Sequence, residues 1–288
     1  MDMFDCGIYS FVNTITVETI RYFAKNSFQH IDVLLSQTQN SEVTLYDNLN
    51  NELKKLYKSF KIIYNDLEKV NSDTNIYFML KKFLKTNDKF VILLERLKFE
   101  GYNGYPALYQ VIYHILYEQM YIKEIFRPLM YTRDIQPKNV VINSAFRKMS
   151  LGTNPIDCIY GQLYFWSLIG AEHPSIIMNI SIDETNQLPM KTINKLKNIT
   201  KRFNNINYNL SEIYPKLNSD NLSDILYKFV ELNNEFITLL NELATNPQYM
   251  PINMKKHLLK LFFNLLEHIT YEHIYAKDLM NKIIKSQY

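Results

Sequence analysis

The sequence predicts an all-α protein made of two four-helix bundles in tandem. The 288 residues include only 6 Gly and 9 Pro, and no Pro precedes Pro106, so long uninterrupted helices are expected. Apolar residues recur at helical spacing in four segments of each half. The run 114–125 also returns at 268–279 with His, Ile, Tyr, Glu, Tyr and Lys at the same spacing. We therefore interpret the chain as an internal duplication.

The predicted domains are a first bundle at residues 1–135, a linker at 136–153 and a second bundle at 154–288. The linker contains Pro137 and a mixed, basic stretch. The second bundle opens with Asn154 as a helix cap and Pro155 at the first helical position.

Four helices are expected in the first half. The first covers about residues 16–35, the second ends near residue 70, the third follows a cap at 71–73, and the fourth ends near Phe126 before Pro128. One largely apolar face of each helix is expected to be buried. In chain order the four faces are Ile20, Phe23, Ser27, His30 and Leu34; Leu49, Leu53, Leu56, Phe60, Ile63 and Leu67; Phe83, Asn87, Phe90, Leu94 and Leu97; and Ala107, Val111, His114, Glu118, Tyr121 and Ile125.

The second half repeats this order. A helix with Leu163, Trp166, Gly170, His173 and Ile177 on one face is followed by a plain packing helix at about 189–210. A third helix matches the third of the first half through Phe229, Asn233 and Phe236. The last helix, about 256–285, is expected to bury Leu261, Leu265, His268, Glu272, Tyr275 and Leu279.

Each half thus places two imidazoles and one carboxylate on apolar helix faces. In a four-helix bundle these faces share one axis, so His30, His114 and Glu118 are expected to meet, and His173, His268 and Glu272 likewise. Such donors suit iron or manganese, with zinc less favoured. Asn87 and Asn233 are candidates for orienting a ligand by hydrogen bonding. No organic cofactor is expected.

A metal-free interpretation stays open. Each His could hydrogen-bond the Glu or Asn of its own half, giving a polar network that fixes helix register. Pro174, directly after His173, is expected to kink or interrupt its helix. His273 lies off the predicted apolar face, which favours an exposed position.

Composition limits the function classes. The net charge of +3 gives no indication of nucleic-acid binding, and no apolar run reaches the roughly 18 residues of a membrane span. Cys6 and Cys158 are the only thiols, and residues 1–5 lack a basic signal-peptide start. We expect a cytoplasmic protein with neither nucleic acid nor membrane as partner.

The runs Gln162 to Trp166 and Ala171 to His173, their weaker counterpart at 20–30, and the two His-x-x-x-Glu helices resemble duplicated ferritin-like proteins of unknown function from spore-forming Firmicutes. The resemblance covers nearly the whole chain. It implies two ferritin-like bundles with a metal in each. Thr19 and Gln162 stand where that family often has Glu. The four carboxylates and paired Glu-x-x-His motifs of a di-iron centre are also missing, so one metal per half is the most that we expect.

Two functions follow from the sequence. The first is a metal-binding protein that holds one ion through His30, His114 and Glu118 and another through His173, His268 and Glu272. The second is a non-catalytic structural or interaction protein, such as a spore-coat component that associates with itself or with other spore-layer proteins. High Tyr content, with 22 residues, favours the second. No catalytic residue or reaction is predicted.

Overall fold

The computed structural model describes residues 14–40, 47–69, 76–100, 106–127, 155–180, 188–214, 219–251 and 256–286. These residues form helices and no strand, so the expected all-α class is confirmed. The chain divides into two compact units, Met1–Thr153 and Asn154–Tyr288. The predicted linker at 136–153 lies outside the described residues.

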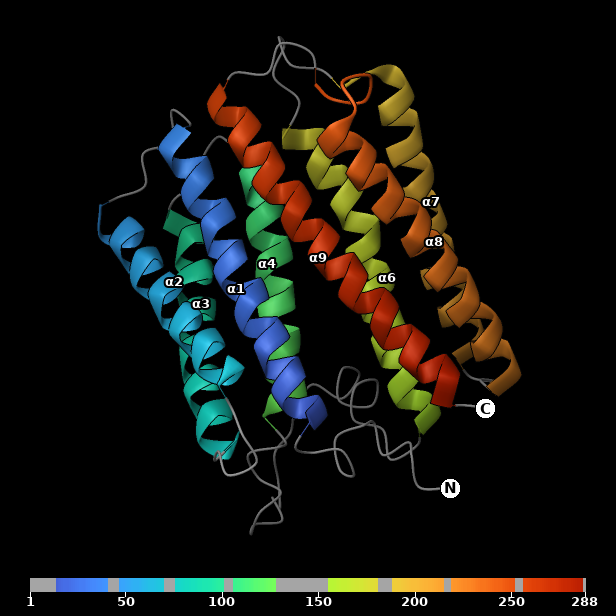
Figure 1. Cartoon of the computed structure of the whole chain (residues 1–288), viewed down its shortest axis with the longest axis horizontal. Coiled ribbons are helices and arrows are strands. Elements are labelled where there is room, and N and C mark those ends of the chain that lie inside the picture. Colours follow the sequence, from blue (N-terminus) through green and yellow to red (C-terminus); the bar gives the residue numbers. More distant parts are fainter. Residues whose placement is uncertain are drawn as a thin grey trace. The chain divides into compact units, whose positions relative to one another are not determined.

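The first unit contains α1 (Thr14–Asn40), α2 (Asp47–Glu68), α3 (Ile76–Glu100) and α4 (Pro106–Phe126) (Figure 1). Each helix packs against the next, and α1 also contacts α3 and α4. The connecting segments, 41–46, 69–75 and 101–105, are too short to run back along helices of roughly 30 Å or more. Successive helices therefore run in opposite directions, as in an up-and-down bundle.

The second unit contains α6 (Pro155–Ile180), α7 (Met190–Ile213), α8 (Ser219–Thr245) and α9 (Lys256–Ser286) (Figure 1). Here α6 contacts all three other helices, α7 packs on α8, and α8 packs on α9. The unit is again a bundle of four helices, and α9 has neighbours on two sides, α6 and α8.

Interlocking aromatic rings form the core of each unit. In the first unit Phe60 of α2 meets Phe83 and Phe90 of α3 edge to face, with centroids 5.9 Å apart in both pairs. In the second unit Phe203 of α7 meets Phe229 and Phe236 of α8 at 5.9 and 6.3 Å. These rings fill the apolar core between α2 and α3 and between α7 and α8.

The predicted apolar faces are buried in α1, α2, α3 and α6, and in α4 wherever its side chains are described. The exception is α9, where Tyr275 and Leu279 are only half-buried. Its core face continues instead through Ala276, Met280 and Ile284. The buried face of α9 is therefore wider than the single line of positions that the spacing predicted.

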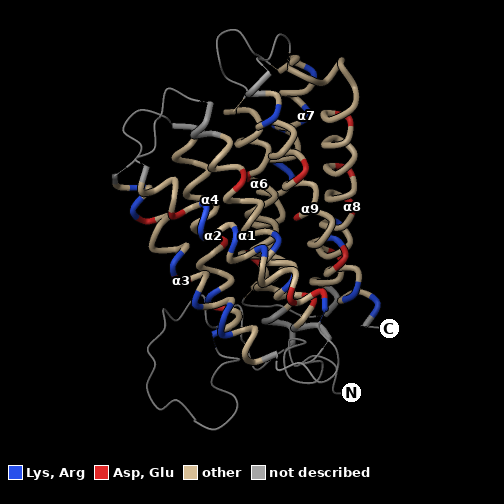
Figure 2. Tube along the Cα trace, turned by 60° about the vertical axis from the view of Figure 1, so that its left-hand side comes forward, with Lys and Arg blue, Asp and Glu red and all other residues tan. Residues whose placement is uncertain are grey.

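Charged residues are distributed unevenly among the helices. Lys and Arg are interspersed with Asp and Glu, while α4 and α6 carry the fewest charges (Figure 2). Even so, no helix among the described residues combines the length and apolar character needed to cross a bilayer.

Candidate metal centres

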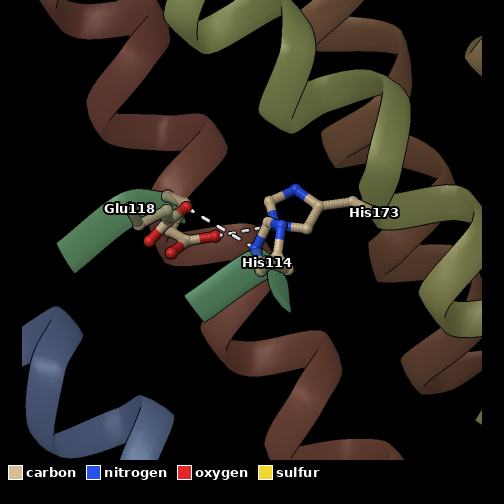
Figure 3. A group of neighbouring side chains, drawn as sticks. His114, Glu118 and His173 are labelled. Carbon is tan, nitrogen blue, oxygen red and sulfur yellow. Dashed lines mark ion pairs between the residues drawn. The ribbon is translucent and has the colours of Figure 1, made fainter. Parts of the chain in front are cut away.

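In the first unit, α1 and α4 bring together the three side chains that the sequence singled out. Nε2 of His30 lies 3.4 Å from Oε2 of Glu118, and Nε2 of His114 lies 3.5 Å from Oε1 of the same carboxylate. Figure 3 shows His114 and Glu118 projecting from the same helix, where they lie one turn apart. All three residues are buried, with His114 the most exposed at 4%. One carboxylate thus faces two imidazoles inside an apolar bundle.

The second unit repeats the arrangement with shorter contacts. Nε2 of His173 on α6 lies 2.9 Å from Oε2 of Glu272, and Nε2 of His268 on α9 lies 3.1 Å from Oε1. The carboxyl of Glu272 is fully buried. In both units the same three residue types meet through the same atoms.

Amide side chains surround the first cluster. Nδ2 of Asn26, one turn before His30, donates to Oε2 of Glu118 at 3.2 Å. Nε2 of Gln119 lies 3.5 Å from Nδ1 of His30, and Oε1 of Gln119 accepts from the hydroxyl of Ser27 at 3.1 Å. The carboxylate and one imidazole therefore each have a neutral neighbour in addition to one another.

An imidazole occupies the matching position in the second unit. Nε2 of His273 lies 2.9 Å from Nδ1 of His173, and Nδ1 of His273 lies 2.6 Å from Oδ1 of Asn233. His273 is only 2% exposed and packs against the rings of Phe203 and Phe236. The expectation that His273 is exposed is therefore wrong. The wide buried face of α9 admits Glu272 and His273 side by side.

The predicted role of the two asparagines also needs correction. Asn233 contacts His273 rather than one of the three predicted ligands. Asn87 donates through Nδ2 to the backbone carbonyl of Gln119 at 2.9 Å. Each amide thus supports the neighbour of a ligand, one step further from the carboxylate than the sequence suggested.

Pro174 does not interrupt its helix, so of the two expected effects, a kink or an interruption, the interruption is wrong. α6 continues from Pro155 to Ile180 with the proline inside it. Gly170 lies four residues earlier, where a proline ring crowds the backbone. A side chain there would also collide with Phe203, since a Cβ on Gly170 would lie 2.7 Å from its ring. His173 consequently still reaches Glu272.

The charge of Glu272 is set by opposing effects. Burial alone acts to raise the pKa of this carboxyl, but the charge of His268 and the close contacts with both imidazoles hold its pKa well below the usual 4.5. Glu272 is therefore a carboxylate at neutral pH, which is the form that binds cations.

Each imidazole nitrogen is spaced from the carboxylate oxygen that it faces about as two ligands of one ion would be. Ligands about 2.1 Å from a common metal lie about 3.0 Å apart in octahedral and about 3.4 Å apart in tetrahedral geometry. The four N–O separations, 3.4 and 3.5 Å in the first unit and 2.9 and 3.1 Å in the second, lie in this range or about 0.1 Å beyond it. Buried His and Glu side chains among the described residues could hold a metal ion.

Comparison with known sequences does not indicate a function for the two His–Glu clusters. No model of a known protein family matches the chain, and no curated protein is significantly similar to it in sequence. The case for function depends on the buried side chains themselves.

Proposed function

We propose that this protein binds metal, with about one divalent transition-metal ion in each unit. His30, His114 and Glu118 would hold the first ion, and His173, His268 and Glu272 the second. The observation that carries the proposal is that one buried carboxylate contacts Nε2 of two buried imidazoles in both units. A cation offsets the cost of placing such groups in an apolar core.

The ligand set favours iron or manganese, with zinc the third choice. Two imidazole nitrogens and one carboxylate bind all three ions, and three protein ligands leave further coordination positions for water or another small molecule. We assign no reaction or substrate to the site.

The repeated helix order and repeated cluster also support an origin by duplication of a ferritin-like bundle. In ferritin-like proteins the metal ligands project into the bundle from facing helices. The four helices of each unit, with ligands on its first and last helices, fit that description.

The alternative is a metal-free core network in a structural protein, for example one of a spore layer. The contacts of Asn26 with Glu118 and of Gln119 with His30 favour it, because these amides are ordinary partners for buried polar groups. A protein of this kind would hold no ion and would not respond to chelators.

Metal analysis separates the two proposals. The protein is purified without chelator or nickel resin, and its metal content is compared with that of His114→Ala and His268→Ala. The metal-binding proposal expects about two equivalents per chain and a loss of about one in each variant. Glu124→Gln on α4 and Glu267→Gln on α9 are matched controls that should keep both ions. Less than about a tenth of an equivalent in the wild type, unchanged in both variants, would refute it.

A further inference from the structure

The structure fixes which groups donate and which accept in the hydrogen bonds that join His173, His273 and Asn233. Nδ2 of Asn233 donates to the backbone carbonyl of Phe229 at 2.8 Å. A carbonyl oxygen can only accept, so the amide nitrogen must face Phe229 and Oδ1 must face His273. Nδ1 of His273, 2.6 Å from that oxygen, is therefore the donor.

The tautomer of His273 in turn determines the tautomer of the proposed ligand His173. A neutral imidazole that donates from Nδ1 accepts at Nε2, so His273 accepts from Nδ1 of His173 across 2.9 Å. Nε2 of His173 then presents its lone pair toward Oε2 of Glu272, 2.9 Å away. Two electron-rich atoms at this distance in a buried site need a cation between them, either a second proton on His173 or a metal ion, and a metal ligand requires the neutral imidazole with its proton on Nδ1.

In the first unit, the described residues do not fix the tautomer of His30 in this way. Gln119 takes the place of His273, and an amide can present either its donor or its acceptor end to His30. The hydroxyl of Ser27 can donate or accept and so does not orient the amide. As placed, the amide nitrogen faces Nδ1 of His30, which favours a proton on Nε2, the atom that a metal would need.

Two further differences point the same way. Asn26 donates to Glu118 and takes up part of its capacity to bind a cation, whereas Ile169 occupies the matching position on α6. Oδ1 of Asn87 is buried and has no hydrogen-bond partner among the described residues, although Asn233 uses the equivalent oxygen to hold His273. Among the described residues, an imidazole that is itself held by an amide contacts a proposed ligand in the second unit and not in the first.

We infer that His273, held by Asn233, is a positioning residue that fixes the metal-binding tautomer of His173, and that the second unit consequently binds its ion more tightly than the first. The inference rests on the proposed metal binding. Loss of such a supporting hydrogen bond typically weakens metal affinity by about 10- to 100-fold.

Mn²⁺ titration of the full-length, metal-free protein tests the difference, with free Mn²⁺ followed by its electron paramagnetic resonance signal. The wild type should show two classes of site, with dissociation constants about 10- to 100-fold apart. The tighter class should survive Glu118→Gln, which disables the first unit. Adding His273→Gln to Glu118→Gln should weaken the remaining site about 10- to 100-fold.

The reciprocal change is the matched comparison. In a Glu272→Gln background, which leaves only the first unit's site, Gln119→His should tighten Mn²⁺ binding, because the new imidazole can donate to Oδ1 of Asn87. Equal affinities in the two units, unmoved by His273→Gln, would overturn the inference and leave the proposed function standing. Absence of Mn²⁺ binding in the wild type would overturn both.

The tautomer can be read without any variant. Long-range ¹H–¹⁵N correlation spectra of the metal-free protein, labelled with ¹⁵N-histidine, should show His273 protonated at Nδ1 and bare at Nε2. A proton on Nε2 of His273, alone or in addition to Nδ1, would overturn the inference. A metal-free network would give His273 the same tautomer, so the Mn²⁺ affinity of His273→Gln is the readout that separates positioning of a ligand from a purely structural role.

Discussion

Replacing Glu272 by Gln tests the second cluster with little change in shape. The carboxylate is fully buried and lies 2.9 and 3.1 Å from the two imidazoles, so the amide would occupy the same space without the negative charge. A metal held by this cluster should be lost, because two imidazoles alone form an incomplete site. A metal-free network could accommodate the amide, which offers one acceptor and one donor to its neighbours.

The size of the effect follows from binding linkage. An ion present at 100 times its dissociation constant stabilises the folded unit by about 2.7 kcal/mol. At about 4 °C per kcal/mol for a unit of this size, Mn²⁺ should raise the melting temperature of the second unit by roughly 10 °C. In Glu272→Gln this rise should disappear, whatever the amide does to the metal-free stability.

The chain provides a convenient probe for this measurement. Its single tryptophan, Trp166, is 2% exposed on α6, so its fluorescence reports unfolding of the second unit. Thermal unfolding is recorded with Mn²⁺ and with chelator for the wild type, Glu272→Gln and the exposed control Glu267→Gln. An undiminished Mn²⁺ shift in Glu272→Gln would refute the assignment of this carboxylate as a ligand.

Two further predictions concern stability of the second unit. Gly170→Ala should lower the free energy of unfolding in urea by about 1–3 kcal/mol, since the ring of Phe203 must move to admit the methyl group; an unchanged urea midpoint would contradict this packing. Because the pKa of Glu272 is lowered on folding, its contribution is present above about pH 4.5 and is lost as the pH falls below that value. The free energy of unfolding of the metal-free wild type should therefore fall more steeply than that of Glu272→Gln between about pH 5 and pH 3. Parallel pH profiles of the two proteins would show that folding does not lower the pKa of Glu272.

Helical periodicity was sufficient to predict most of the fold. Apolar residues that recur every three or four positions line one face of a helix, and in a bundle that face is buried against the neighbouring helices. The leucines from Leu49 to Leu67 on α2 are buried in this way. The prediction was wrong in the second half of α9. There the core face includes Ala276 and Met280, while the predicted Tyr275 and Leu279 are half-buried.

The six proposed ligands could be found from the sequence because a polar residue on an apolar face stands out, and the repeat showed the pattern twice. Their neighbours could not be found in this way. Asn26, Gln119 and His273 lie beside the predicted faces, and their contacts depend on which side chains the facing helices present. The shared position of Gln119 and His273 was the available signal, since a polar residue adjoined the Glu in both halves.

An anomalous-scattering map from crystals grown without added metal tests the central claim most directly. Metal binding predicts a peak in each unit, about 2.0–2.2 Å from Nε2 of His30 and His114 and from Glu118, and at the same distance from the corresponding atoms of His173, His268 and Glu272. Clear density for both clusters with no anomalous peak at either, at energies above the iron, manganese and zinc edges, would contradict it.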